Sequence, residues 1–179
     1  MTGFRQLDET VVYEGRVVTL AQGRFRAPDG RIVERDCFRH PGAVSVVPLL
    51  GDDVVMVRQY RAAIDRELLE IPAGKRDVTD EPPEVTANRE LMEEVGYRAR
   101  SLTLLSRFYN SAGFCDELSL VYLGEDLEPA PTDLQGVEEE HMRIEHVRLA
   151  TVPDLIASGE LCDAKSIIGC LLALRARSG

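Results

Sequence analysis

Three glutamates lie close together in the stretch that reads Arg-Glu-Leu-Met-Glu-Glu-Val-Gly and ends at Gly96. On a helix with about 100° per residue, Glu90, Glu93 and Glu94 fall within an arc of roughly 100°. The adjacent arc is apolar and should face the core, since it carries Ala87, Leu91, Met92 and Val95. Like charges at i,i+4 destabilise a helix by about 0.2–0.5 kcal/mol, and a hard divalent cation such as Mg²⁺ relieves that repulsion.

A cation held by carboxylates neutralises a diphosphate, polarises phosphorus and lowers the pKa of water. The three glutamates therefore indicate metal-dependent phosphoryl chemistry. Taken alone, they also fit a helix face that is simply solvated, and that alternative stays open at this point.

The surrounding sequence predicts the elements that must position these carboxylates. Pro82 and Pro83 suit the first turn of a helix over residues 84–95, and Gly96 suits its C-terminal cap. Further helices are expected from Thr151 and from Asp163, two plausible N-caps. Residues 125–140, rich in acidic residues, proline and glycine, read as a loop. Apolar or alternating runs predict strands at 11–18, 24–38 (a hairpin turning at 28–30), 42–50, 54–60, 68–71, 102–109, 117–123 and 142–149. Strands followed by mixed strands and helices predict an α+β fold.

Composition narrows the range of functions. The chain has 179 residues, enough for one domain with a small extension, and 44% of them are hydrophobic. Its formal charge of −10 argues against non-specific binding to nucleic acid or to an anionic membrane. No signal peptide or apolar span is recognisable. The 4 cysteines are scattered without a CxxC motif, so we predict a cytoplasmic protein with reduced thiols and no zinc cluster.

The residues around the three glutamates resemble the Nudix box, G-x5-E-x7-R-E-U-x-E-E-x-G-U, in which U is a bulky apolar residue. There are two departures: the gap between Gly74 and Glu81 holds six residues rather than five, and the last position is Tyr97 rather than an aliphatic. The matching positions are Gly74, Glu81, Arg89, Glu90, Leu91, Glu93, Glu94, Gly96 and Tyr97.

This resemblance implies a Mg²⁺-dependent hydrolase, with Mn²⁺ as a possible substitute. It implies an α/β/α sandwich with a mixed sheet, and an N-terminal antiparallel β-sheet extension. The implied metal ligands are Glu90 and Glu94, together with the backbone carbonyl of Ala73. Glu93 would bind a second ion or act through a water molecule. Arg89 would orient a neighbouring carboxylate, either Glu81 or Glu93.

A glutamate outside the box is also implied by the resemblance, on a loop before a late strand. Glu140 is favoured for this role, then Glu139 and Glu138, although at least one of the three is expected to be simply solvated. The catalytic set is therefore Glu94, Glu93, Arg89, Glu140 and Glu139. The implied reaction is attack of water on one phosphorus of a diphosphate, assisted by two or three Mg²⁺.

Segments outside the box resemble the ADP-ribose pyrophosphatase subfamily. Arg-Gln-Tyr-Arg at 58–61 and Glu-Ile-Pro-Ala-Gly at 70–74 match its patterns, and residues 111–117 match its loop except that Ala112 replaces a proline. ADP-ribose would give AMP and ribose 5-phosphate. GDP-mannose, a dinucleoside polyphosphate or an oxidised nucleotide remain alternatives. The predicted substrate-binding residues are Arg58, Tyr60, Arg61, Glu70, Gly113 and Phe114. Other interpretations stay open for these residues. Arg58 and Arg61 could be surface residues at the end of a strand, and residues 111–117 could be only a glycine turn. Tyr60 and Phe114 could lie in the core.

The resemblance further implies that the N-terminal strands exchange between subunits, so we predict a homodimer. Residues 1–41 are expected to form the N-terminal extension, and residues 42–179 the Nudix domain. A non-catalytic nucleotide-sugar sensor with the same fold is the alternative from another functional class. Such a sensor would be expected to have lost some of its carboxylates, whereas every acidic position of the box is intact here.

Overall fold

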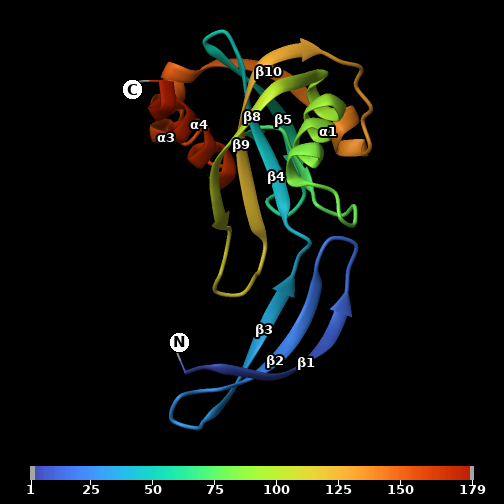
Figure 1. Ribbon diagram of the computed structural model, residues 1–179, viewed down its shortest axis with the longest axis vertical. Coiled ribbons are helices and arrows are strands. Elements are labelled where there is room, and N and C mark those ends of the chain that lie inside the picture. Colours follow the sequence, from blue (N-terminus) through green and yellow to red (C-terminus); the bar gives the residue numbers. More distant parts are fainter. Residues whose placement is uncertain (1–2, 178–179) are drawn as a thin grey trace. The chain divides into compact units, whose positions relative to one another are not determined.

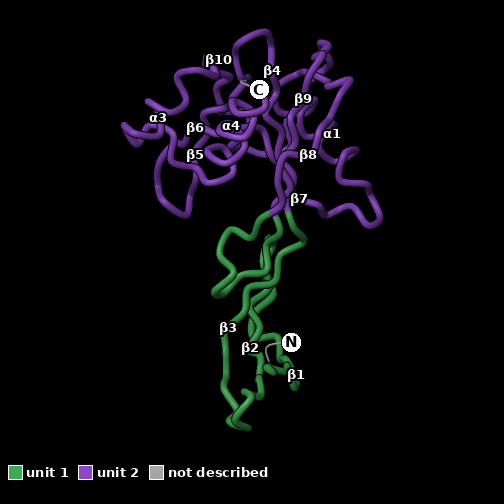
Figure 2. Tube along the Cα trace, turned by 60° about the vertical axis from the view of Figure 1, so that its left-hand side comes forward, with its two compact units in different colours: residues 1–42, 108–118 green, residues 43–107, 119–179 purple. Residues whose placement is uncertain are grey.

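Residues 3–177 are described in the computed structural model of the chain, and their contacts divide them into two units (Figure 2). The first contains the residues up to Gly42 together with residues 108–118, and the second contains residues 43–107 and those from Ser119 onward. Residues 108–118 thus group with the N-terminal strands, although the predicted division after residue 41 does not include them.

The second unit is built on a mixed sheet of seven strands (Figure 1). β4 and β9 pair in parallel at the centre, whereas β5 pairs with β10 in antiparallel fashion. The order along the main path is β10-β5-β4-β9-β8, with β6 beside β5 and β7 beside β4. The strands are β4 (Ala43–Leu50), β5 (Asp53–Arg61), β6 (Arg66–Glu70), β7 (Ala73–Lys75), β8 (Tyr97–Tyr109), β9 (Leu118–Pro129) and β10 (Arg143–Arg148).

Helices cover both faces of this sheet, which makes the unit an α/β/α sandwich. One face carries α1 (Pro83–Val95), whose Leu91 and Val95 pack with Val46 and Val57 of the sheet. The other carries α4 (Ala164–Arg177), where a Cβ at Gly169 would lie 2.8 Å from both Val47 and Val121. The remaining helices are α2 (Val137–Glu140), the 3-10 turn η1 (Leu149–Thr151) and α3 (Val152–Ser158).

A fork between β4 and β5 positions the residues of the predicted site. The two strands pair only near their turn, at residues 49–50 and 53–54. Farther along, β5 pairs with β6 while β4 pairs with β7. Ile71 and Pro72 therefore cross the fork from one strand to the other. The N–H of Val46 donates to the carbonyl of Pro72 over 3.0 Å, which fixes the crossing on β4.

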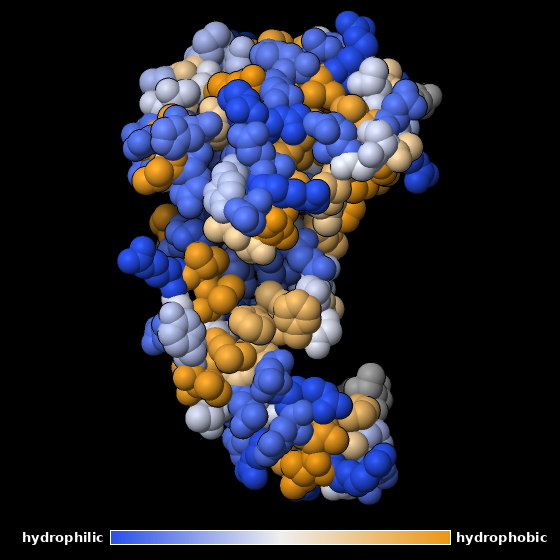
Figure 3. Space-filling model, turned by 180° about the vertical axis from the view of Figure 1, so that it is seen from behind, coloured by the Kyte–Doolittle hydropathy of each residue, from blue (hydrophilic) through white to orange (hydrophobic). Residues whose placement is uncertain are grey.

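The first unit contains a separate antiparallel sheet in the order β1-β2-β3. Its strands are β1 (Arg5–Glu14), β2 (Thr19–Arg26) and β3 (Ile32–Arg39). The loop at 111–117 joins this unit, because the N–H of Phe38 donates to the carbonyl of Phe114 over 2.7 Å. Apolar side chains reach the surface of the unit (Figure 3), and on β1 they include Val11, Val12 and Tyr13.

The fold class is as predicted, and most element positions agree, but several boundaries were wrong. The first strand ends at Glu14 rather than residue 18, since Gly15 N–H donates to the carbonyl of Val18 in a tight turn. β9 extends to Pro129, into the predicted loop. Asp163 does cap α4, whereas the hydroxyl of Thr151 donates backwards to Arg148 and caps nothing. Within the described residues, no helix is long and apolar enough to cross a membrane.

Candidate active site

Helix α1 presents the three glutamates as the sequence predicts. Prolines at the start and Gly96 in the left-handed conformation (φ 71°) at the end set its limits. Glu94 is buried, with 4% of its surface exposed. The side chains of Glu90 and Glu93 are 14% and 19% exposed. One helix therefore carries a graded set of carboxylates, from buried to accessible.

Arg89 lies among the carboxylates and contacts three of them. Its guanidinium donates to Glu90 over 2.8 Å, to Glu93 over 3.2 Å and to Glu81 over 3.3 Å. Burial by itself lowers the pKa of Arg89, but the hydrogen bond to Glu81 and the charges of all three glutamates outweigh it and raise that pKa. Arg89, which is predicted to orient a carboxylate, thus contacts both of its predicted partners, Glu81 and Glu93.

Gly74 makes room for Glu90. A Cβ at residue 74 would lie 1.9 Å from the carboxyl carbon of Glu90 and 2.2 Å from each of its oxygens. No side chain fits there, so the glycine of the box is required because the carboxylate of α1 packs directly on the backbone of β7.

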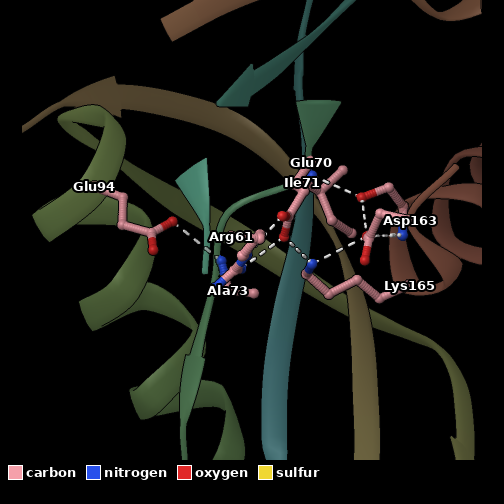
Figure 4. Close-up of polar contacts among 8 residues, drawn as sticks. Arg61, Glu70, Ile71, Ala73, Glu94, Asp163 and Lys165 are labelled. Carbon is pink, nitrogen blue, oxygen red and sulfur yellow. Dashed lines mark hydrogen bonds and ion pairs between the residues drawn. The ribbon is translucent and has the colours of Figure 1, made fainter. Parts of the chain in front are cut away.

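Glu94 contacts the fork itself. The N–H of Ala73 donates to Oε2 of Glu94 over 3.1 Å, as Figure 4 shows. Burial raises the pKa of Glu94 to about 8; the hydrogen bond from Ala73 opposes this rise, and the charges of Glu90 and Glu139 add to it. Burial likewise raises the pKa of Glu90 to about 7. Too little positive charge lies near these two carboxyl groups to offset their burial. Each therefore loses its proton at a higher pH than an ordinary glutamate does.

These residues fit a divalent cation by their donor chemistry. Glu90 and Glu94 are desolvated carboxylates that repel each other, and a hard cation supplies the charge that they lack. Among residues 3–177, no three acidic, histidine or cysteine side chains already enclose a metal position. Arg89 instead serves as the positive partner of Glu90 and Glu93.

The alternation of side chains along β5 separates the predicted substrate residues. Arg61 shares the α1 face with Val57 and donates to buried Glu70 through two bonds of 2.7 Å. Arg58 and Tyr60 point to the other face. There Arg58 is engaged by Glu145 and Glu160, each over 2.6 Å. The sequence groups both arginines together, but the pleat leaves only Arg61 beside the carboxylates of α1.

The acidic run before β10 also separates into different environments. Glu139 is partly buried and accepts the N–H of Gln135 over 2.6 Å, and its charge raises the pKa of both Glu90 and Glu94. Glu138 and Glu140 are exposed. Of the three, Glu139 is the one whose charge acts on the box.

Two predicted substrate residues, Gly113 and Phe114, belong to the first unit. They help to line a cavity of about 460 Å³ there, with Phe25, Arg39 and Asp116 among its other walls. The ring of Phe114 meets Phe38 edge-on at 5.9 Å.

Polar residues at the start of α4 were missed by sequence reasoning. Lys165 forms an ion pair with Glu70, and Ser166 accepts the N–H of Ile71 over 2.9 Å. These partners stand 95 residues apart in the chain. No local spacing signals such contacts, and only the N-cap character of Asp163 points to an ordered helix start.

The chain belongs to the Nudix family, because residues 39–167 match the family model of the NUDIX domain, and its box is built in three dimensions as described above. It is a pyrophosphohydrolase of that family.

Relatives and a solved structure agree with this assignment. The chain is 38% identical to the ADP-ribose pyrophosphatase of Bacillus subtilis (strain 168), over 87% of this chain and 84% of that protein. It is 34% identical to the ADP-ribose pyrophosphatase of Mycobacterium tuberculosis (strain ATCC 25618 / H37Rv), over 94% and 82% respectively. A crystal structure of an ADP compounds hydrolase superposes with a TM-score of 0.83 at 26% identity, covering 98% of this chain and 95% of that one.

Proposed function

We propose that this enzyme hydrolyses the diphosphate of ADP-ribose, or of a related nucleoside-diphosphate sugar, with Mg²⁺ as its cofactor and Mn²⁺ as a possible substitute. AMP and ribose 5-phosphate are the products expected from ADP-ribose. The observation that carries the proposal is the pair of neighbouring carboxyls on α1, buried Glu94 and partly buried Glu90, whose raised pKa values call for a cation. The names of the two pyrophosphatase relatives support the choice of substrate.

Glu90, Glu93 and Glu94, with the carbonyl of Ala73, would hold Mg²⁺, which when bound neutralises the diphosphate and makes water a better nucleophile. Arg89 keeps the carboxylates turned towards one another through its three contacts. Arg61 offers the remaining edge of its guanidinium to a phosphate, since its side chain stays 43% exposed while two of its nitrogens bond to Glu70.

Glu139 is our preferred candidate to take the proton from the attacking water. Its charge acts on Glu90 and Glu94, whereas Glu140, the first choice from sequence, is exposed. Glu139→Gln should therefore lower kcat by about 10²–10⁴-fold, the usual range for a positioned general base. Glu140→Gln is the matched comparison, and a larger loss at Glu140 would restore the sequence-based order.

The substrate is tested with a panel of ADP-ribose, ADP-glucose, GDP-mannose and Ap4A. The enzyme is assayed with Mg²⁺, with Mn²⁺ and with chelator, and phosphate is released from the products by added phosphatase. We expect ADP-ribose to give the highest kcat/KM, with AMP and ribose 5-phosphate identified by chromatography. Turnover in chelator would contradict the metal requirement, and a higher kcat/KM for GDP-mannose or Ap4A would reassign the substrate. Binding of ADP-ribose without hydrolysis would favour the sensor.

We also infer that the enzyme is a homodimer joined through its N-terminal strands. Three consecutive large apolar side chains on β1 support this, because Val11, Val12 and Tyr13 are 59%, 62% and 66% exposed. A second copy of the same strand is an apolar partner of matching size. A cytoplasmic location remains a prediction from the sequence.

A further inference from the structure

The crossing segment Ile71–Ala73 is attached to three different elements. The carbonyl of Pro72 accepts the N–H of Val46 on β4 over 3.0 Å. The N–H of Ala73 donates to Glu94 on α1 over 3.1 Å, and the N–H of Ile71 donates to Ser166 on α4 over 2.9 Å. Two of the three attachments use side chains rather than a backbone ladder. The position of Ala73 therefore depends on helices from both faces of the sheet.

Ser166 is a defined acceptor because Asp163 orients it. The hydroxyl of Ser166 donates to Asp163 Oδ2 over 2.5 Å, and the N–H of Ser166 donates to the same oxygen over 3.0 Å. With its proton given to Asp163, the hydroxyl turns a lone pair towards Ile71. Ser166 has no exposed surface, so water cannot substitute for it.

Lys165 attaches the same helix to the residue before the crossing. Its ammonium pairs with Glu70 and lies 3.0 Å from Asp163 (Figure 4). Burial alone raises the pKa of Glu70, but Arg61 and Lys165 outweigh it and hold the pKa below its ordinary value. The start of α4 thus holds both Glu70 and Ile71, which lie three and two residues before Ala73.

We propose that Asp163 and Ser166 are positioning residues of the hydrolase site, which hold Ile71 so that Ala73 faces Glu94. This inference rests on the proposed function, since it assumes that Ala73 and Glu94 take part in binding the cation. It assigns a role in catalysis to α4, the helix on the opposite face of the sheet from the Nudix box.

Direct metal binding tests the proposal separately from turnover. Mn²⁺ is titrated into the metal-free full-length enzyme and followed by electron paramagnetic resonance. Ser166→Ala should weaken Mn²⁺ binding by about 10–100-fold, the usual loss when the support of a ligand is removed. At saturating Mn²⁺, kcat should stay reduced while KM for ADP-ribose changes less. Thermal unfolding shows whether the variant is folded.

Cys170→Ala is the matched control, because Cys170 is fully buried on the same helix and makes no bond to the crossing. Asp163→Asn is the milder second variant if Ser166→Ala does not fold, and it should weaken Mn²⁺ binding in the same direction. Wild-type affinity for Mn²⁺ in Ser166→Ala overturns the proposal. If only Asp163→Asn folds, wild-type affinity for Mn²⁺ in that variant overturns it. An equal loss of Mn²⁺ affinity in Cys170→Ala overturns it as well. If the wild-type enzyme itself neither binds Mn²⁺ nor hydrolyses ADP-ribose, the proposed function fails instead.

Discussion

Glu94 combines burial with a single backbone hydrogen bond from Ala73. A carboxylate in that setting is costly unless a cation joins it, which is how a metal ligand differs from an ordinary surface glutamate. The pKa of Glu90 is raised as well, although Arg89 donates to Glu90 as it does to Glu93. At the scale of single residues, the carboxylates of the box therefore differ in burial, and the most buried of them, Glu94, is stabilised most by a bound cation.

Glu94→Gln should lower kcat by about 10²–10⁴-fold, the range for loss of a positioned catalytic carboxylate. The amide keeps the size of the side chain and can still accept from Ala73, so the fold should survive. Steady-state kinetics at saturating Mg²⁺ measures the loss. Glu128→Gln is the control, since it removes a surface carboxylate paired with Arg100 on neighbouring β8. A Glu94→Gln enzyme within a few-fold of wild type would remove Glu94 from the mechanism.

Gly74→Ala tests the close packing of β7 on Glu90. The added methyl would lie 1.9 Å from the carboxyl carbon, so Glu90 must move and the metal affinity should fall. We expect a stability loss of about 1–3 kcal/mol, typical of overpacking. Glu90→Asp in the same chain shortens the side chain and should recover stability without recovering activity. Denaturant unfolding and activity assays of both variants measure this, and a fully active Gly74→Ala would refute the packing argument.

At the scale of elements, α1 should make the metal-free protein sensitive to pH. The pKa values of Glu90 and Glu94 are raised from 4.5 to about 7 and about 8. The folded state then holds protons that the unfolded state has released above pH 4.5. This stabilisation is complete below about pH 4.5 and is lost as pH rises through 7 and 8. At about 1.4 kcal/mol per pKa unit, Glu94 alone accounts for a few kcal/mol of this pH-dependent change in the free energy of unfolding.

Thermal unfolding in chelator at pH 5.5, 7.0 and 8.5 should therefore show a falling Tm. Mg²⁺ should restore stability most at pH 8.5, because it replaces the lost protons. Glu94→Gln should flatten the profile. An equally steep profile in that variant would place the effect on other groups.

Local signals explain which elements could be predicted. The helix α1 is bounded by Pro83 and Gly96, and its carboxylates follow from helical periodicity. Alternation along a strand puts Arg58 and Arg61, three residues apart, on opposite faces of the sheet, but which of the two faces α1 depends on how the helix packs on the sheet. Ser166 and Lys165 depend on contacts across 95 residues, which no local pattern encodes.

At the scale of the whole molecule, the proposed dimer is tested through β1. Light scattering should give twice the chain mass at micromolar concentration. Val12→Asp places a charge on an apolar surface that is 62% exposed, so it should weaken association while costing the isolated chain little. A wild-type protein that stays monomeric at micromolar concentration would contradict the dimer, and unchanged association of Val12→Asp would move the interface elsewhere.

The crossing of the fork at Ile71–Ala73 has a consequence for spectroscopy. Two of its amide protons are protected by side chains, Ser166 for Ile71 and Glu94 for Ala73, and not by a neighbouring strand. Their hydrogen-exchange rates should therefore report separately on the two helices. Exchange at Ile71 should speed up in Ser166→Ala, whereas exchange at Ala73 should respond to Glu94→Gln and to added cation. These two protons would serve as native probes of the links from each helix layer to the fork.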